Sequence, residues 1–206
     1  MIAADPFQGG ATWAVLQYLI GLRNLGHEVY FIEPLAEKSL TSKGAFLEQS
    51  INAKYFCMVM NEFAFEKNSA LITQDNKQTL GLSYQAIKRI ASRTDLLINI
   101  SGMLADEEVI SRIPLRVYLD LDPAFNQIWH SVYGIDMRFS AHNRFVTVGQ
   151  AIGSKNCPVP SCGIEWKTTF QPVVLDKWPV ADKIIYSGWC HLSICVARAR
   201  PENNNR

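Results

Sequence analysis

The chain has 206 residues, of which 48% are apolar and 19% charged, and its 20 basic and 19 acidic side chains leave a formal net charge of +1. This length supports one globular domain with a tail, because two full α/β domains need roughly 100–200 residues each. The near-neutral charge argues against binding to nucleic acid or to an anionic membrane. The sequence contains neither a run of about eighteen apolar residues nor a signal-peptide pattern, so we expect a cytoplasmic protein without a membrane span.

The cysteines argue for free thiols. The sequence contains five cysteines, an odd number, and the chain is long enough to build a core without disulfides. They are Cys57, Cys157, Cys162, Cys190 and Cys195. Two prolines lie between Cys157 and Cys162, and no second pair with zinc-site spacing follows them. We therefore expect neither a metal nor a cofactor.

The first predicted element is a helix. From Ala11 to Leu25 the apolar residues recur with the spacing of a helix that faces a core. Gly26 supplies a left-handed residue that ends the helix, and a strand at Val29–Ile32 follows. This unit, which begins after Gly9-Gly10, is the second part of a βαβ crossover. Only Ile2, Ala3 and Ala4 precede Asp5-Pro6, so the first strand is very short or the chain begins inside it.

The later elements alternate between strands and helices. In chain order we expect a strand or buried apolar segment at Lys54–Met60, a helix at Leu82–Arg93, a central parallel strand at Leu96–Ile100, a short helix at Asp106–Ser111, and strands at Leu115–Leu121 and Phe145–Val148. This alternation predicts an α/β fold, namely a Rossmann-like, doubly wound and mostly parallel sheet in a single domain of residues 1–180.

The end of the chain differs in character from the rest. Lys183 to Arg200 contains no acidic residue, and an asparagine run follows. We expect residues 181–206 to form an irregular tail, disordered or frameshifted, that does not belong to the folded core.

Candidate site residues lie where the predicted strands end, because ligands of an open parallel sheet bind outside the carboxyl ends of its strands. A phosphate or sugar can approach the backbone of Gly9 and Gly10 closely, although two glycines can also simply make a tight turn. Ser101, Gly102 and Asp122 are the other predicted substrate-binding residues. His142 is the predicted catalytic base, since an imidazole titrates near neutral pH; a loop histidine can equally serve only as a hydrogen-bonding residue.

Several residues permit competing interpretations. Asp120 and Asp122 lie two apart and share one face of a strand, which permits metal binding, but an aspartate before Pro123 also suits a turn or helix cap. Glu33 stands where an acid binds ribose in dehydrogenases, yet the G-x-G-x-x-G fingerprint is missing and a solvated carboxylate is the simpler interpretation. The tryptophans Trp129, Trp166 and Trp178 can stack on a sugar ring or pack in a core.

Two sets of residues resemble a known family. The first is Gln8-Gly9-Gly10-Ala11-Thr12-Trp13 followed by Gly21-Leu22-Arg23-Asn24-Leu25-Gly26-His27-Glu28-Val29-Tyr30-Phe31-Ile32-Glu33, which resembles the first βαβ unit of bacterial glycosyltransferases of the GT-B type. The other set resembles the later part of the same domain in an uncharacterised glycosyltransferase-like group; it comprises Asp120-Leu121-Asp122-Pro123, Gln127-Ile128-Trp129, His142, Thr147-Val148-Gly149, Ile152-Gly153, Pro160, Cys162-Gly163, Trp166 and Gln171-Pro172-Val173. The resemblance covers about residues 1–180.

The resemblance implies a function. Enzymes of this type use two facing Rossmann-like domains, of which the N-terminal one usually holds the acceptor and the C-terminal one the nucleotide sugar, without an obligatory metal. The chain would correspond to the acceptor-side domain, apparently truncated at both ends and inactive alone. Its partner would be a sugar acceptor, and a nucleotide sugar would bind in a full-length relative. Two alternatives stay open: a non-catalytic interaction module that reuses the fold, and a small nucleotide-dependent oxidoreductase.

Overall fold

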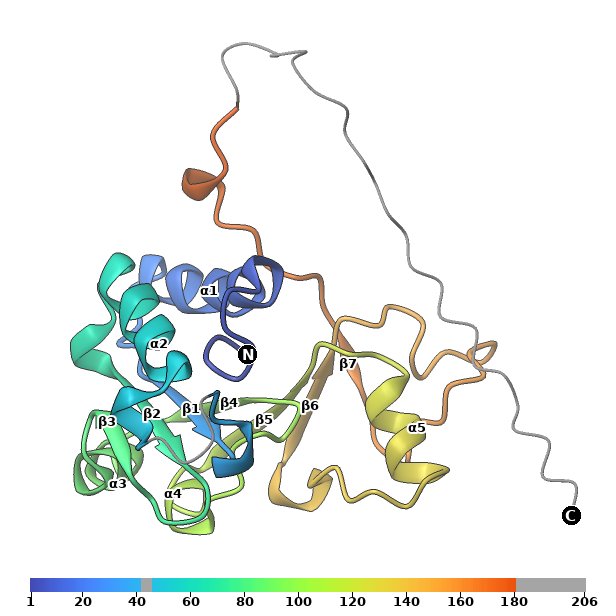
Figure 1. The fold of residues 1–206 in the computed structure, drawn as a ribbon. Coiled ribbons are helices and arrows are strands. Elements are labelled where there is room, and N and C mark those ends of the chain that lie inside the picture. Colours follow the sequence, from blue (N-terminus) through green and yellow to red (C-terminus); the bar gives the residue numbers. More distant parts are fainter. Residues whose placement is uncertain (42–45, 181–206) are drawn as a thin grey trace, which may run out of the picture. The chain divides into compact units, whose positions relative to one another are not determined.

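The fold is known from a computed structural model that describes residues 1–41 and 46–180 (Figure 1). The chain divides into a compact unit, Met1–Val174, and a second unit that begins at Leu175. Within the second unit, the described residues include one 3₁₀ turn, η5 (Leu175–Lys177). The predicted domain of residues 1–180 overlaps the first unit, whereas the predicted tail, residues 181–206, lies outside the described residues.

The strands form two sheets in a mixed α/β fold. In the first sheet β1 (Phe31–Leu35) pairs in parallel with β2 (Ser69–Thr73), and β2 pairs antiparallel with β3 (Thr79–Gly81). The second sheet is parallel throughout, in the order β4 (Leu96–Ile100), β5 (Leu115–Asp120), β6 (Arg144–Thr147) and β7 (Lys167–Thr168). A parallel sheet with intervening helices is compatible with the Rossmann-like fold that the sequence predicts.

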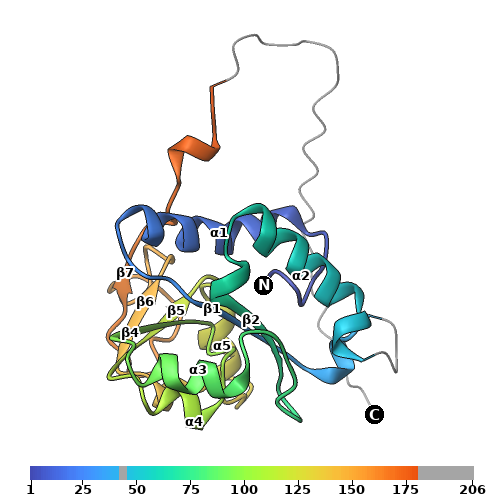
Figure 2. The same ribbon diagram turned by 90° about the vertical axis from the view of Figure 1, so that its left-hand side faces the viewer.

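Helices lie on both sides of the strands. The described α-helices are α1 (Gly9–Asn24), α2 (Ile51–Glu62), α3 (Tyr84–Ala91), α4 (Glu107–Ile110) and α5 (Phe125–Ser131), and short 3₁₀ turns are η1 (Glu37–Ser39), η2 (Leu47–Gln49), η3 (Glu66–Asn68) and η4 (Phe139–Ala141). Both views place α1 and α2 on one side of β1 and β2, and α3 and α4 on the other (Figures 1 and 2). One buried apolar cluster accordingly joins α1 and α2 to β1, and a second joins α3 and α4 to Ala70 of β2.

Much of the predicted element order is confirmed. The helix expected from Ala11 is α1, and the strand expected at Leu96–Ile100 is β4 with the same bounds. The expected central position of this strand is wrong, because β4 is the edge strand of the second sheet. The helices expected at Leu82–Arg93 and Asp106–Ser111 and the last two predicted strands are also present. In contrast, β2, β3, α5 and β7 were not predicted, and β1 begins at Phe31 rather than at Val29.

Of the two alternatives for Lys54–Met60, a strand or a buried apolar segment, the strand is wrong. These residues belong to α2, whose buried side chains include Tyr55, Phe56, Val59 and Met60. Their spacing puts them on one helix face, and the hydroxyl of Ser50 accepts a 3.0 Å hydrogen bond from the backbone N–H of Ala53 at the helix start. Such a cap is a helix signal, because it satisfies one of the donors that the first turn leaves unpaired.

The N-terminal residues form no strand and instead surround Glu33. The Glu33 carboxylate is fully buried and accepts hydrogen bonds from the backbone N–H groups of Ile2 (3.2 Å), Ala3 (2.8 Å) and Ala4 (3.0 Å). The side-chain amide of Asn52 donates to the Ala3 carbonyl at 2.7 Å. The interpretation of Glu33 as a solvated carboxylate is therefore wrong, and its oxygens are turned to the protein's own backbone rather than to a ribose.

Aromatic side chains fill a third core next to β5 and β6. Tyr118 of β5 is fully buried and meets Phe139 and Trp166 edge to face, at centroid distances of 4.9 and 5.9 Å. The indole N–H of Trp166 donates to the Ser161 carbonyl at 3.0 Å. Trp166 is thus a core residue, which was one of its two possible roles.

Candidate functional site

Polar side chains meet at the carboxyl ends of β4, β5 and β6. Because these neighbouring strands are parallel, Ser101, Asp120 and Thr147 come together at one edge of the sheet. The fully buried Asp120 carboxylate accepts hydrogen bonds from Asn126 Nδ2 (2.6 Å), Gln127 Nε2 (2.7 Å) and Thr147 Oγ1 (2.8 Å). Asp120 thereby fixes the first turn of α5 to the ends of two strands.

The predicted pair Asp120 and Asp122 does not form a metal site. Asp120 also accepts the backbone N–H of Asp122 at 3.1 Å, so its oxygens are occupied by donors of the fold. Asp122 is exposed. Among residues 1–41 and 46–180 no group of three potential metal ligands is found. Asp120 accepts the N–H group two residues further on, which fits the turn that was the alternative interpretation, and Asp122 is the accessible carboxylate after β5.

Ser101 and Gly102 both adopt left-handed backbone conformations directly after β4, with φ of +48° and +64°. A Cβ at Gly102 would lie 2.9 Å from the carbonyl oxygen of Met137 and 3.1 Å from the ring of Tyr118, so packing alone requires glycine there. The Ser101 hydroxyl is half-buried and receives a 3.3 Å hydrogen bond from Asn126 Nδ2. Ser101 thus belongs to the polar cluster, and Gly102 shapes the loop beside it.

Gly9 and Gly10 are the first two residues of α1 and are exposed. Neither has a positive φ, and a Cβ added to either would meet no atom within 4 Å. The alternative that these glycines merely make a tight turn therefore has no support. The first N–H groups of a helix lack acceptors within the helix, and at Gln8, the residue before α1, no side-chain capping bond forms. A ligand can approach the backbone here more closely than it could with side chains present.

His142 lies in the protein interior. Its side chain is 7% exposed, Nδ1 donates to the Arg138 carbonyl at 2.9 Å, and Nε2 accepts from Asn99 Nδ2 at 3.0 Å in the tautomer that fits both partners. Asn99 is held in turn by two bonds to the backbone of Leu104. Burial lowers the pKa of His142 below its ordinary value. The catalytic role of His142 stays a prediction, and one that this geometry disfavours because both ring nitrogens are in use.

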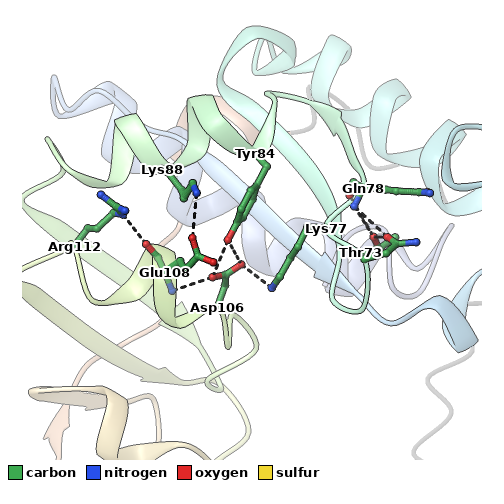
Figure 3. A network of polar contacts seen from close by, with 9 residues as sticks. Thr73, Lys77, Gln78, Tyr84, Lys88, Asp106, Glu108 and Arg112 are labelled. Carbon is green, nitrogen blue, oxygen red and sulfur yellow. Dashed lines mark hydrogen bonds and ion pairs between the residues drawn. The ribbon is translucent and has the colours of Figure 1, made fainter.

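A second polar cluster surrounds Asp106 (Figure 3). Its carboxylate pairs with Lys77 Nζ at 2.7 Å and accepts the Tyr84 hydroxyl at 3.0 Å, which ties the β2–β3 turn to α3 and α4. Burial raises the pKa of Asp106, but the hydrogen bonds from Lys77 and Tyr84 outweigh it and hold the pKa below its ordinary value. Burial and the bond to Asp106 raise the pKa of Tyr84 to about 12.

Two hollows in the described part of the chain lie away from the polar cluster around Asp120. The one beside Asp106 has about 140 Å³, below the roughly 300–1,000 Å³ of usual ligand pockets. A shallower one of about 480 Å³ follows the last turns of α3, which lead to the amino end of β4. The Asp106 cluster is therefore a clamp between elements, and the candidate site residues are Ser101 and Asp122 after β4 and β5 together with Gly9 and Gly10 at the start of α1.

Sequence reasoning missed Asn126, Gln127 and Arg138. The pair Asn126-Gln127 follows Asp122-Pro123 at the start of a helix, a signal that polar side chains there can turn back to a strand-end carboxylate. No local sequence pattern marks Arg138, because its side chain is positioned by Gly102, which is 36 residues away in sequence.

Comparison with known proteins gives no relative: no protein-family model, no curated protein and no solved structure matches this chain. Within the described ranges, no helix has both the length and the apolar character needed to cross a lipid bilayer. The function must therefore be inferred from the chain's own residues.

Proposed function

We propose that this chain is the acceptor-binding domain of a sugar-transferring system, with a doubly wound Rossmann-like sheet that holds a hydroxylated acceptor at its carboxyl edge. The proposal depends chiefly on Gly9 and Gly10. Glycine costs helix stability, and no feature of the fold requires it at either position. Close approach of a ligand to the N–H groups of the first turn explains both glycines.

The groups around this edge suit a sugar. The accessible Asp122 carboxylate can accept hydrogen bonds from the hydroxyl groups of a sugar, and the Ser101 hydroxyl can both donate and accept them. Phe125 at the start of α5 is 61% exposed and Trp129 is 41% exposed, with ring centroids 5.7 Å apart. Exposed aromatic rings of this kind offer an apolar face to a sugar ring.

The chain is not expected to transfer sugar by itself. In the enzymes that it resembles, a separate domain binds the nucleotide sugar, and transfer depends on positioning donor and acceptor against each other. Incubation of the purified chain with common nucleotide sugars and simple acceptors should give no product above a boiled control.

Acceptor binding is tested by titrating a panel of mono- and disaccharides into ¹⁵N-labelled protein. We expect at least one saccharide to shift the backbone amide signals of Gly9 and Gly10, with Ser101 as a further reporter at the carboxyl end of β4. The Lys77 amide in the Asp106 clamp is the internal control and should not move. Absence of any saccharide-dependent shift at Gly9 and Gly10 would rule out the proposed function.

A second candidate, a non-catalytic interaction module, is favoured by one observation. Five large apolar side chains between residues 125 and 135 are exposed by 41–70%: Phe125, Trp129, Val132, Tyr133 and Ile135. Clustered exposed apolar side chains often mark a protein-binding surface. Substitution of Trp129 by Ala separates the two functions, since it weakens saccharide binding under the first and only self-association or partner binding under the second.

A further inference from the structure

Arg138 occupies a conformation that bulky residues rarely adopt. Its φ is +57°, in the left-handed region, immediately before η4. Its backbone N–H donates to Asp136 Oδ1 at 2.8 Å, and its carbonyl accepts Nδ1 of His142 at 2.9 Å. Backbone strain that is maintained by several contacts is frequently associated with function.

The same contacts position the Arg138 side chain. One guanidinium nitrogen, Nη1, donates to the Gly102 carbonyl at 2.9 Å, across 36 residues of sequence. The buried pair Asn99 and His142 links the loop after β4 to the carbonyl of Arg138. The fold thus holds an arginine head at the carboxyl end of β4, next to Ser101 of the candidate site.

The charge of Arg138 is not neutralised within the described part of the chain. Arg138 is exposed, and the ion pairs found there, Lys77–Asp106 and Lys88–Glu108, do not include it. Asp136 binds its backbone N–H instead, and Asp122 forms no ion pair with it. A guanidinium has five N–H donors, so most remain for a ligand.

A buried hydroxyl nearby also lacks a partner. The Tyr118 hydroxyl is buried and no hydrogen bond to it is found among the described residues. Burial and the nearby Asp120 raise the pKa of Tyr118, while the positive charge of Arg138 opposes them. The ring of Tyr118 and the Cβ atom of Arg138 both lie beside Gly102, so Arg138 is close enough to act electrostatically on this region.

We propose that Arg138 binds an anionic group, a carboxylate or a phosphate, of the acceptor at the carboxyl end of β4. Both groups accept two parallel hydrogen bonds from a guanidinium fork, which lysine cannot provide. The inference names the chemical class of the acceptor, an acidic sugar, and so rests on the proposed function. Arg138 is then a binding residue, and His142 and Asn99 are positioning residues behind it.

The test compares Arg138→Gln with Arg144→Gln by calorimetric titration and NMR. Arg144 is a matched control, because it is exposed at the opposite, amino end of β6 and donates only to its neighbour Asn143. The probes are inorganic phosphate, glucose 6-phosphate, glucuronate and glucose. We expect the acidic sugars to bind more tightly than glucose, and this advantage to fall by about 10–100-fold in Arg138→Gln but not in Arg144→Gln.

The arms separate the two proposals. An equal advantage of the acidic sugars in wild type and Arg138→Gln, or an equal loss in both variants, would overturn the anion site. If glucose shifts the Gly9 and Gly10 signals while the acidic sugars bind no more tightly than glucose, acceptor binding is supported and the anion site is refuted. If phosphate binding depends on Arg138 but no sugar moves those signals, the anion site stands and its assignment to a sugar acceptor is lost. A thermal melt of each variant confirms that it is folded.

Discussion

Substitutions of Glu33 test how the N-terminal residues are held. Glu33→Ala would remove the acceptor of three N–H groups, of which those of Ile2 and Ala3 are fully buried. A buried donor left without a partner costs about 1–3 kcal/mol, so Glu33→Ala should reduce the free energy of unfolding by about 2–6 kcal/mol. In Glu33→Gln the amide oxygen still accepts from Ala3 and Ala4, and only the bond to Ile2 is lost, so the expected cost is about 1–3 kcal/mol.

The pH dependence of the Glu33→Gln penalty gives a sharper result. Burial raises the pKa of Glu33, and the N–H groups of Ala3, Ala4 and Ile2 lower it only in part. The pKa of Glu33 in the folded state therefore exceeds the unfolded value of about 4.3. Glu33 thus binds its proton more tightly in the folded state than in the unfolded state. The stability from protonation is complete below the unfolded pKa and is lost as the pH rises through the folded pKa.

Urea denaturation of wild type and Glu33→Gln at pH 5 and pH 8 measures this effect, because the difference between the two proteins cancels the other titrating groups. We expect the penalty of Glu33→Gln to be larger at the lower pH. A penalty that grows as the pH rises would refute the reasoning, since it would mean that the three N–H groups outweigh burial and favour the ionised carboxylate.

Two further substitutions distinguish structural from functional roles. Gly102→Ala should lower stability by about 1–3 kcal/mol in a thermal melt, because φ is +64° and the added Cβ meets Met137 and Tyr118; an unchanged midpoint would contradict this packing. His142→Ala should cost about 2–4 kcal/mol in urea denaturation, since it leaves a cavity and removes the partner of the Arg138 carbonyl. Unchanged stability of His142→Ala would instead favour the predicted role of His142 as a free catalytic base.

The sequence predicted those parts of the fold that depend on local pattern. The helix from Ala11 has an apolar spacing that suits a helix, and the apolar run at Leu96–Ile100 forms the strand expected of it. The segment Lys54–Met60 was misjudged because a short apolar run fits a strand as well as a buried helix. The cap at Ser50, a few residues earlier, carried the information that decides between them.

The contacts of the candidate site residues could be predicted only in part. Ser101 and Asp122 follow the carboxyl ends of β4 and β5, as the rule for ligands of parallel sheets predicts, whereas Gly9 and Gly10 begin α1 and follow no strand. The burial of Glu33 and His142 could not be predicted, because their partners Ile2 and Asn99 lie 31 and 43 residues away in sequence. Arg138 was missed for the same reason, since its anchor is Gly102.

The central claim is that Gly9 and Gly10 are present for a ligand and not for the fold. The variant Gly9→Ala/Gly10→Ala tests it, with Gly21→Ala as the control. Gly21 lies in the same helix, about 16–18 Å from Gly10 and Gly9 along its axis at 1.5 Å per residue, and its added Cβ would meet only Val174 Cγ2 at an ordinary 3.7 Å.

The measurement is saccharide affinity together with the melting temperature of each variant. Alanine is favoured over glycine in helices by up to about 1 kcal/mol per residue, worth about 2–4 °C in a domain of this size. Both variants should therefore melt at or above the wild-type temperature, while only Gly9→Ala/Gly10→Ala loses saccharide affinity, by tenfold or more as an order of magnitude. Unchanged affinity in that variant, with its stability intact, would contradict the claim.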